Sequence, residues 1–130
     1  MEQNIALITL LVDDYDKAIE FYTTKIGFEL TEDTVIDETK RWVVVKPIGR
    51  SNCGLLLAKA SNEAQKHKIG DQTGGRVFLF LYTDDIDRDY QKLILHNVQI
   101  VREPVVQPYG RVAVFADLYG NLWDLIELAK

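Results

Sequence analysis

An internal repeat is the feature that most restricts the fold of this chain. The segment VDDYDKA begins at Val12, and the related segment TDDIDRD begins at Thr83, 71 positions later. Each copy follows an apolar run typical of a buried strand and precedes a pattern with helical spacing. Self-similarity of this kind predicts one structural unit built twice. We therefore expect the 130 residues to form one domain of two similar modules.

The repeated aspartates mark the beginnings of two helices. Asp14 and Asp85 stand at the expected N-caps, where a carboxylate accepts a hydrogen bond from an otherwise unpaired N–H group. Apolar residues at spacings of three and four predict helices over roughly 15–25 and 86–95. Two residues that tolerate the left-handed conformation follow these helices, namely Gly27 and Asn97. The aspartates are therefore interpreted as structural rather than as a calcium or phosphate site.

Strands surround each helix, which makes the fold class α+β with two tandem βαβββ modules. The expected strands cover residues 5–12, 27–35, 41–47, 54–60, 77–83, 98–104, 111–116 and 121–128. Module 1 is expected over about 1–60 and module 2 over about 76–130, with a polar linker over 61–75. Because proline donates no hydrogen bond to a sheet, the three prolines are interpreted as strand ends: Pro47, Pro104 and Pro108.

Composition and charge restrict the possible partners. The chain is 47% hydrophobic and 27% charged, which is enough for a real core. A net charge of -5 disfavours nucleic acid, because phosphate contacts need clustered Lys and Arg. No apolar run approaches the ~20 residues that span a membrane. The first residues also lack a positively charged stretch and a cleavage site of the secretory type. We therefore expect a cytoplasmic protein that binds neither nucleic acid nor membranes.

The cysteine and the histidines suggest little chemistry. Cys53 is the single cysteine and lies in an apolar run, so it is expected to be a small buried packing residue. His96 falls in the last turn of the second expected helix, where a cation complements the helix dipole. Neither His67 nor His96 lies on an expected strand.

The sequence resembles the vicinal oxygen chelate superfamily, which includes glyoxalase I, bleomycin-resistance proteins and extradiol dioxygenases. The resemblance is carried by ITLLVDDYDKAIEFYTTKIGFEL (8–30), TDDIDRDYQKL (83–93) and FADLYGNLWDLIEL (115–128). It covers nearly the whole chain and implies paired βαβββ modules, a cup-shaped eight-stranded mixed sheet and usually a homodimer. It does not fix an activity, because one fold hosts many functions.

The resemblance also implies where a metal would bind. Metal-using members carry a His, Glu or Gln ligand on the first and last strand of each module, which leaves positions open for substrate oxygens. The matching positions in this chain are Leu7, Leu57, Phe78 and Asp124. Three of these are apolar, and so are the residues on either side of those three. A divalent ion would lose hydration there without gaining ligands, so a metal-free site is expected.

Alternation along the strands predicts an apolar cup with a few polar groups. Its expected lining is Leu7, Thr9, Leu11, Leu55, Leu57, Phe78, Phe80, Tyr82, Leu122 and Asp124. Near the rim, Trp42 beside Arg41 offers a stacking surface, and Arg111 near Tyr109 offers a partner for a carboxylate or phosphate. Glu127 is out of phase with Asp124 and is expected at the solvent-exposed surface. The alternative is that these side chains only fill the core or end strands.

Three functions remain open at this point. The first is a metal-independent small-molecule binding protein of the glyoxalase/bleomycin-resistance type, with an apolar or planar ligand in the cup of a homodimer. The second is a lyase or dioxygenase that uses a divalent metal or takes Asp124 as its base. The third is an interaction module whose cup is packed shut. The apolar lining favours the first, for which no cofactor is expected.

Overall fold

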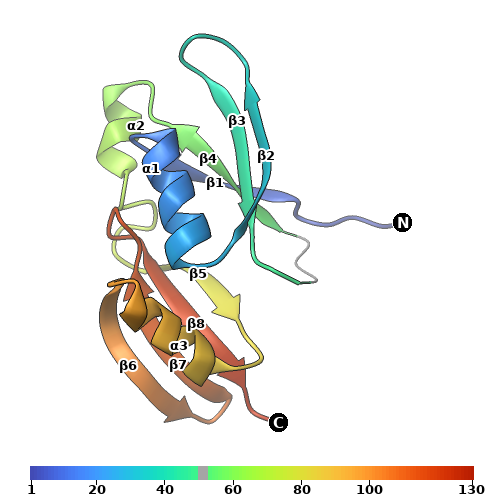
Figure 1. The fold of residues 1–130 in the computed structure, drawn as a ribbon, viewed down its shortest axis with the longest axis vertical. Helices are drawn as coiled ribbons and strands as arrows, with labels where there is room; N and C mark the ends of the chain where they lie inside the picture. Colours follow the sequence, from blue (N-terminus) through green and yellow to red (C-terminus); the bar gives the residue numbers. More distant parts are fainter. Residues whose placement is uncertain (50–52) are drawn as a thin grey trace. The chain divides into compact units, whose positions relative to one another are not determined.

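The structure is a computed structural model that describes residues 1–49 and 53–130. The chain divides into two compact units, Met1–Ile69 and Gly70–Lys130 (Figure 1). Unit 1 contains β1 (Leu7–Val12), α1 (Tyr15–Glu20), the π-helix η1 (Phe21–Lys25), β2 (Glu29–Val35), β3 (Arg41–Lys46), β4 (Gly54–Lys59) and α2 (Glu63–Lys68). Unit 2 contains β5 (Val77–Tyr82), α3 (Ile86–Leu95), β6 (Gln99–Gln107), β7 (Gly110–Ala116) and β8 (Leu122–Leu128).

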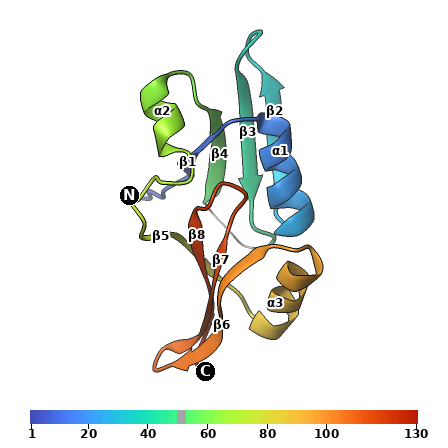
Figure 2. The same cartoon turned by 90° about the vertical axis from the view of Figure 1, so that its left-hand side faces the viewer.

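Each unit holds one four-stranded mixed sheet. The strand orders are β1-β4-β3-β2 in unit 1 and β5-β8-β7-β6 in unit 2. The first and last strand of each unit pair in parallel, and the other neighbours are antiparallel. Within unit 2, α3 lies against one face of its sheet in both views (Figures 1 and 2). The α+β class with two βαβββ units, predicted from the repeat, is confirmed.

The helix ends follow the local sequence. Asp14 Oδ1 accepts a hydrogen bond from the Lys17 N–H at 3.0 Å, and Asp85 Oδ1 accepts one from the Arg88 N–H at 3.0 Å. Both N-cap predictions are thus confirmed. Gly27 and Asn97 have φ angles of 90° and 58°, as expected for residues that follow a helix.

The first helix differs from its predicted form in its second half. It is α-helical only to Glu20, and residues 21–25 form a π-helix in which the Ile26 N–H donates to the Phe21 carbonyl at 3.1 Å. Phe21 and Tyr22 are consecutive and both buried, with their rings edge to face at 5.2 Å. The wider π-turn accompanies this burial of two neighbouring aromatic side chains on one side of a helix.

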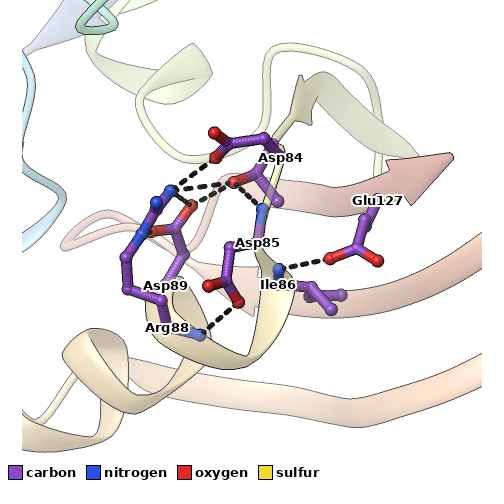
Figure 3. A network of polar contacts seen from close by, with 7 residues as sticks. Asp84, Asp85, Ile86, Arg88, Asp89 and Glu127 are labelled. Carbon is purple, nitrogen blue, oxygen red and sulfur yellow. Dashed lines mark hydrogen bonds and ion pairs between the residues drawn. The ribbon is translucent and has the colours of Figure 1, made fainter.

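Glu127 supports the N-terminus of α3, which corrects its expected place at the solvent-exposed surface. Its side chain is half-buried, and Oε1 accepts a hydrogen bond from the Ile86 N–H at 2.9 Å (Figure 3). Beside it, Arg88 donates to Asp84 at 2.8 Å and to Asp89 at 2.9 Å. Two carboxylates from different elements, Asp85 and Glu127, therefore satisfy N–H groups that the first helical turn leaves unpaired.

Strand β6 is longer than predicted, because Pro104 lies inside it and does not end it. The strand pairs only with β7, at the edge of the sheet, so one side of its backbone needs no partner. The register shifts between Ile100 and Arg102 and again between Arg102 and Val105. Pro47 and Pro108 do follow the last residues of β3 and β6, as expected.

The core of each unit lies between its sheet and its first helix. In unit 2, Phe115 and Trp123 are cross-strand partners whose rings stack at 5.8 Å. Ile86 and Leu93 of α3 are buried in the same unit. Side chains of this size each stabilise the fold by about 1.5–3 kcal/mol when fully buried. These contacts fix the sheet and therefore the residues on its other face.

The segment expected to link the modules contains α2, with Asn62 as its N-cap. Cys53 is half-buried rather than buried. Among the helices of the described residues, none is both long and apolar enough to cross a membrane.

Candidate functional site

The sheet of unit 2 has one face toward α3 and one face away from it. Arg111 donates to Asp87 of α3 at 2.9 and 3.0 Å, and Glu127 binds the N-terminus of the same helix. Arg111 and Glu127 are cross-strand partners, so both face α3. Because side chains alternate along a strand, Asp124 lies on the opposite face. We call this the Asp124 face: Phe80, Tyr82, Arg102, Val112, Val114, Leu122, Asp124 and Ile126.

One row of residues crosses all four strands of the Asp124 face. Phe80 pairs with Asp124, Asp124 with Val114, and Val114 with Arg102. Neighbouring strands are ~4.8 Å apart, so each member of the row lies directly beside the next. The row thus places an aromatic ring on one side of the carboxylate and, beyond a valine, a guanidinium on the other.

The aromatic side chains of this face are unusually accessible. Phe80 is 62% exposed and Tyr82 is 64% exposed, both on the edge strand β5. The adjoining side chains of Val112, Val114 and Ile126 are buried. The two exposed aromatic side chains offer a surface on which a planar molecule can stack, whereas the buried aliphatic side chains beside them hold the strands in place.

Asp124 is a half-buried carboxylate whose acceptor capacity is largely unused. Burial raises its pKa above the ordinary value, and the positive charge of Arg102 works in the opposite direction. Within residues 1–49 and 53–130, no hydrogen bond or ion pair to this side chain is seen, and its cross-strand neighbours Phe80 and Val114 have no donor side chain. The carboxylate can therefore accept a hydrogen bond from a ligand or take up a proton.

Unit 1 shows the same division into faces. Arg41 contacts Asp16 of α1 at 2.9 Å, so it faces that helix, and alternation along β3 turns Trp42 the other way. Arg41 also binds Asp33 at 2.7 Å, and these two carboxylates raise the pKa of its guanidinium. Arg41 was expected near the rim of the cup, but its guanidinium is instead paired with two carboxylates of its own unit. Trp42 Nε1 donates to Glu32 at 3.3 Å.

The predicted lining mixed the two faces of the first sheet. Leu57 pairs with Val43 and Leu10, and all three are fully buried on the side of α1, together with Leu55. Thr9 instead pairs with Leu56, which the prediction left out. The face away from α1 is the Thr9 face: Leu7, Thr9, Leu11, Trp42, Val44 and Leu56. The signal that separates Leu56 from Leu57 is the strand register, which the sequence of β4 does not reveal.

The predicted residues of unit 2 divide in a similar way. Phe80, Tyr82, Leu122 and Asp124 share the Asp124 face. Phe78 lies at a register shift between Val77 and Leu79 and is half-buried. Arg111 is paired with Asp87 on the α3 side, away from Asp124, and Tyr109 is exposed in the turn before β7. Arg102 was missed, because the irregular register of β6 hides which of its side chains share a face with Asp124.

Comparison with known proteins identifies the family. Residues 4–125 match the family model of the Glyoxalase/Bleomycin resistance protein/Dioxygenase superfamily. The chain belongs to this superfamily. A protein of Shewanella frigidimarina, itself described as uncharacterised, is 56% identical over 98% of this chain and 96% of its own length.

Two solved structures are similar to nearly the whole chain. UcmS2 superposes with a TM-score of 0.83 at 32% identity, covering 97% of this chain and 98% of UcmS2. TnmS3, an antibiotic binding protein from Streptomyces sp. CB03234, superposes with a TM-score of 0.81 at 30% identity, covering 98% of each chain.

The divalent metal that metal-using members of the superfamily bind would need a group of ligand side chains among the described residues. Across the described parts of the chain, no three His, Cys, Asp or Glu side chains gather as a metal site would require. Asp124 is flanked by Phe80 and Val114. In the repeat, Leu56 occupies the place in the row of unit 1 that Asp124 occupies in unit 2. The donor set at these positions therefore does not fit a divalent ion.

Proposed function

We propose that this protein is a metal-independent small-molecule binding protein that holds an apolar or planar ligand. The observation that carries the proposal is the pair of exposed aromatic side chains, Phe80 and Tyr82, beside the half-buried Asp124 on one sheet face. A ligand that stacks on the aromatic rings would bury apolar surface, and Asp124 would orient its polar edge.

Two further points support a binding role. TnmS3, which is similar along nearly its whole length, is an antibiotic binding protein. The positions where the family resemblance implies metal ligands are apolar in three of four cases, which removes the usual basis for oxygen-chelating chemistry. The proposal includes a homodimer in the cytoplasm, as the family resemblance implies for the assembly.

Native mass spectrometry of the freshly purified, untagged protein tests this function. We expect a dimer that carries no stoichiometric metal ion, with an added organic mass where the ligand survives purification. The Phe80→Ala/Tyr82→Ala double variant should lose that added mass but keep the number of subunits and the fold. A divalent ion that survives buffer exchange at one per site would contradict the metal-independent proposal.

The alternative is a glyoxalase-like lyase or dioxygenase, and one observation favours it. Burial raises the pKa of Asp124, which moves a carboxylate toward the range useful for a general base. An assay of a 1,2-dicarbonyl adduct with glutathione, with and without added divalent ions, separates the two functions. Turnover that Asp124→Asn abolishes would support the enzyme, and absence of turnover with intact ligand binding would support the binding protein.

A further inference from the structure

We propose that the Asp124 face selects planar ligands that carry a cationic N–H group at one edge, and that Asp124 receives this group. The inference rests on the proposed function, because it names the ligand class of the same site. It is drawn from three features of unit 2: the position of the aromatic rings, a carboxylate that accepts no hydrogen bond from the described residues, and the place of Arg102.

The first feature is the direct neighbourhood of ring and carboxylate. Phe80 and Asp124 are register partners on parallel strands, and Tyr82 follows Phe80 on the same face. Strands lie ~4.8 Å apart, which is about the length of one N–H···O contact plus one ring bond. A planar ligand stacked on Phe80 therefore brings its own edge to the Asp124 oxygens.

The second feature is the chemical need of Asp124. Its cross-strand neighbours Phe80 and Val114 donate no hydrogen bond. A carboxylate that loses water without gaining a donor is costly, and a bound N–H group removes that cost. A cationic donor does so best, because charge-assisted hydrogen bonds are roughly twice as strong as neutral ones. The net charge of -5 also favours a cation over an anion.

The third feature gives the ligand a direction. Arg102 stands on the far side of Val114, at the β6 end of the row. It repels a ligand cation on that side and leaves the β5 side, next to Phe80, for the positive group. Arg102 is thus inferred to be a specificity residue, and its removal should strengthen the binding of a cation.

Three matched probes test the inference by isothermal titration calorimetry at pH 7: 9-aminoacridine, which is a cation, acridine, which is mainly neutral, and acridine-9-carboxylate, which is an anion. We expect the cation to bind roughly tenfold or more tightly than the neutral ring, and the anion to bind least. Asp124→Asn should lower the affinity for the cation to nearly that for the neutral probe. Arg102→Met should raise the affinity for the cation further. Glu38→Gln removes the same charge from an exposed turn of unit 1 and should change nothing.

Each of the other possible outcomes overturns a defined part of this inference. Equal affinity for the three probes, lost in Phe80→Ala/Tyr82→Ala, overturns the charge selection and leaves the proposed function standing. A preference for the cation that persists in Asp124→Asn assigns the selection to overall charge and overturns the role of Asp124. Absence of binding by all three probes to a folded protein overturns the inference together with the proposed function.

Discussion

Asp124 carries a free-energy cost that depends on pH. Because burial raises its folded-state pKa above the ordinary value of 3.8, ionisation is less favourable in the folded state. The raised pKa contributes to the free energy of unfolding while the carboxyl group is protonated. This contribution is fully present below pH 3.8 and is lost as the pH rises through the raised pKa. Asp124→Asn removes this loss. We expect the variant to be more stable at pH 7, by roughly 0.5 kcal/mol, with no gain near pH 3.

Thermal unfolding of wild type and Asp124→Asn at both pH values measures this difference. Arg102→Met, which removes the charge that favours the ionised form, should act in the opposite direction at pH 7. A gain for Asp124→Asn that is equal at pH 3 and pH 7 would show that ionisation is not its cause.

Gly110 is required by a close approach of two strands. It has a φ of 149°, and a Cβ at this position would lie 2.2 Å from the carbonyl oxygen of Glu127. Gly110→Ala forces β7 and β8 apart, so we expect a loss of about 2 kcal/mol or more. Gly74→Ala is the matched control, since its φ of 66° is strained but nothing lies within 4 Å. It should cost about 1 kcal/mol. Urea unfolding compares them, and equal losses would contradict the steric explanation.

At the scale of elements, the helices were largely predictable because their signals are local. The N-cap Asp85 and the following Asn97 are within one short window of sequence, and α3 has the bounds that its spacing predicts. The π-helix over 21–25 was not predictable, because it depends on burial of Phe21 and Tyr22 against the sheet. Only tertiary packing distinguishes it from a continued α-helix.

The faces of the strands were predicted less well, because they depend on register. A uniformly apolar stretch such as β4 gives no alternation, so Leu57 was placed with Thr9 although Leu56 is the partner. In β6 the register shifts hide the position of Arg102. The prediction that Asp124 and Glu127 lie on opposite faces of the sheet is confirmed, because β8 is regular and its side chains alternate without a register shift against β7.

The contact of Glu127 with α3 is the element-scale feature that mutation tests most directly. Its carboxylate accepts the Ile86 N–H, which the helix itself cannot satisfy. Glu127→Ala should cost about 1 kcal/mol in the free energy of unfolding, as for loss of an N-cap. Glu127→Gln keeps an acceptor oxygen and should cost clearly less. Urea denaturation gives both values, and an equal loss for the two variants would mean that charge, not the hydrogen bond, matters.

At the scale of the whole chain, the repeat explains the fold but not the site. Both units use an aspartate N-cap, a covering helix and a parallel pairing of first and last strands. The central rows have nevertheless diverged: unit 1 carries Thr9 and Leu56 where unit 2 carries Phe80 and Asp124. The candidate site therefore lies on unit 2, although the architecture is duplicated.

This divergence predicts how the whole protein responds to metals. An ion that binds only the folded state with a Kd of ~1 µM would stabilise it by about 2.7 kcal/mol at ~100 µM, through mass action. For a chain of this size that is a rise in Tm of roughly 10 °C. Because the described residues offer no group of three ligands, we expect Zn²⁺, Mn²⁺, Ni²⁺ and EDTA each to shift the Tm by less than about 1 °C. Differential scanning calorimetry measures this, with Asp124→Asn as the matched variant. A shift of several degrees in wild type that Asp124→Asn removes would instead make Asp124 a metal ligand. Water molecules would then have to fill the other coordination positions of the ion, because the neighbouring side chains are apolar.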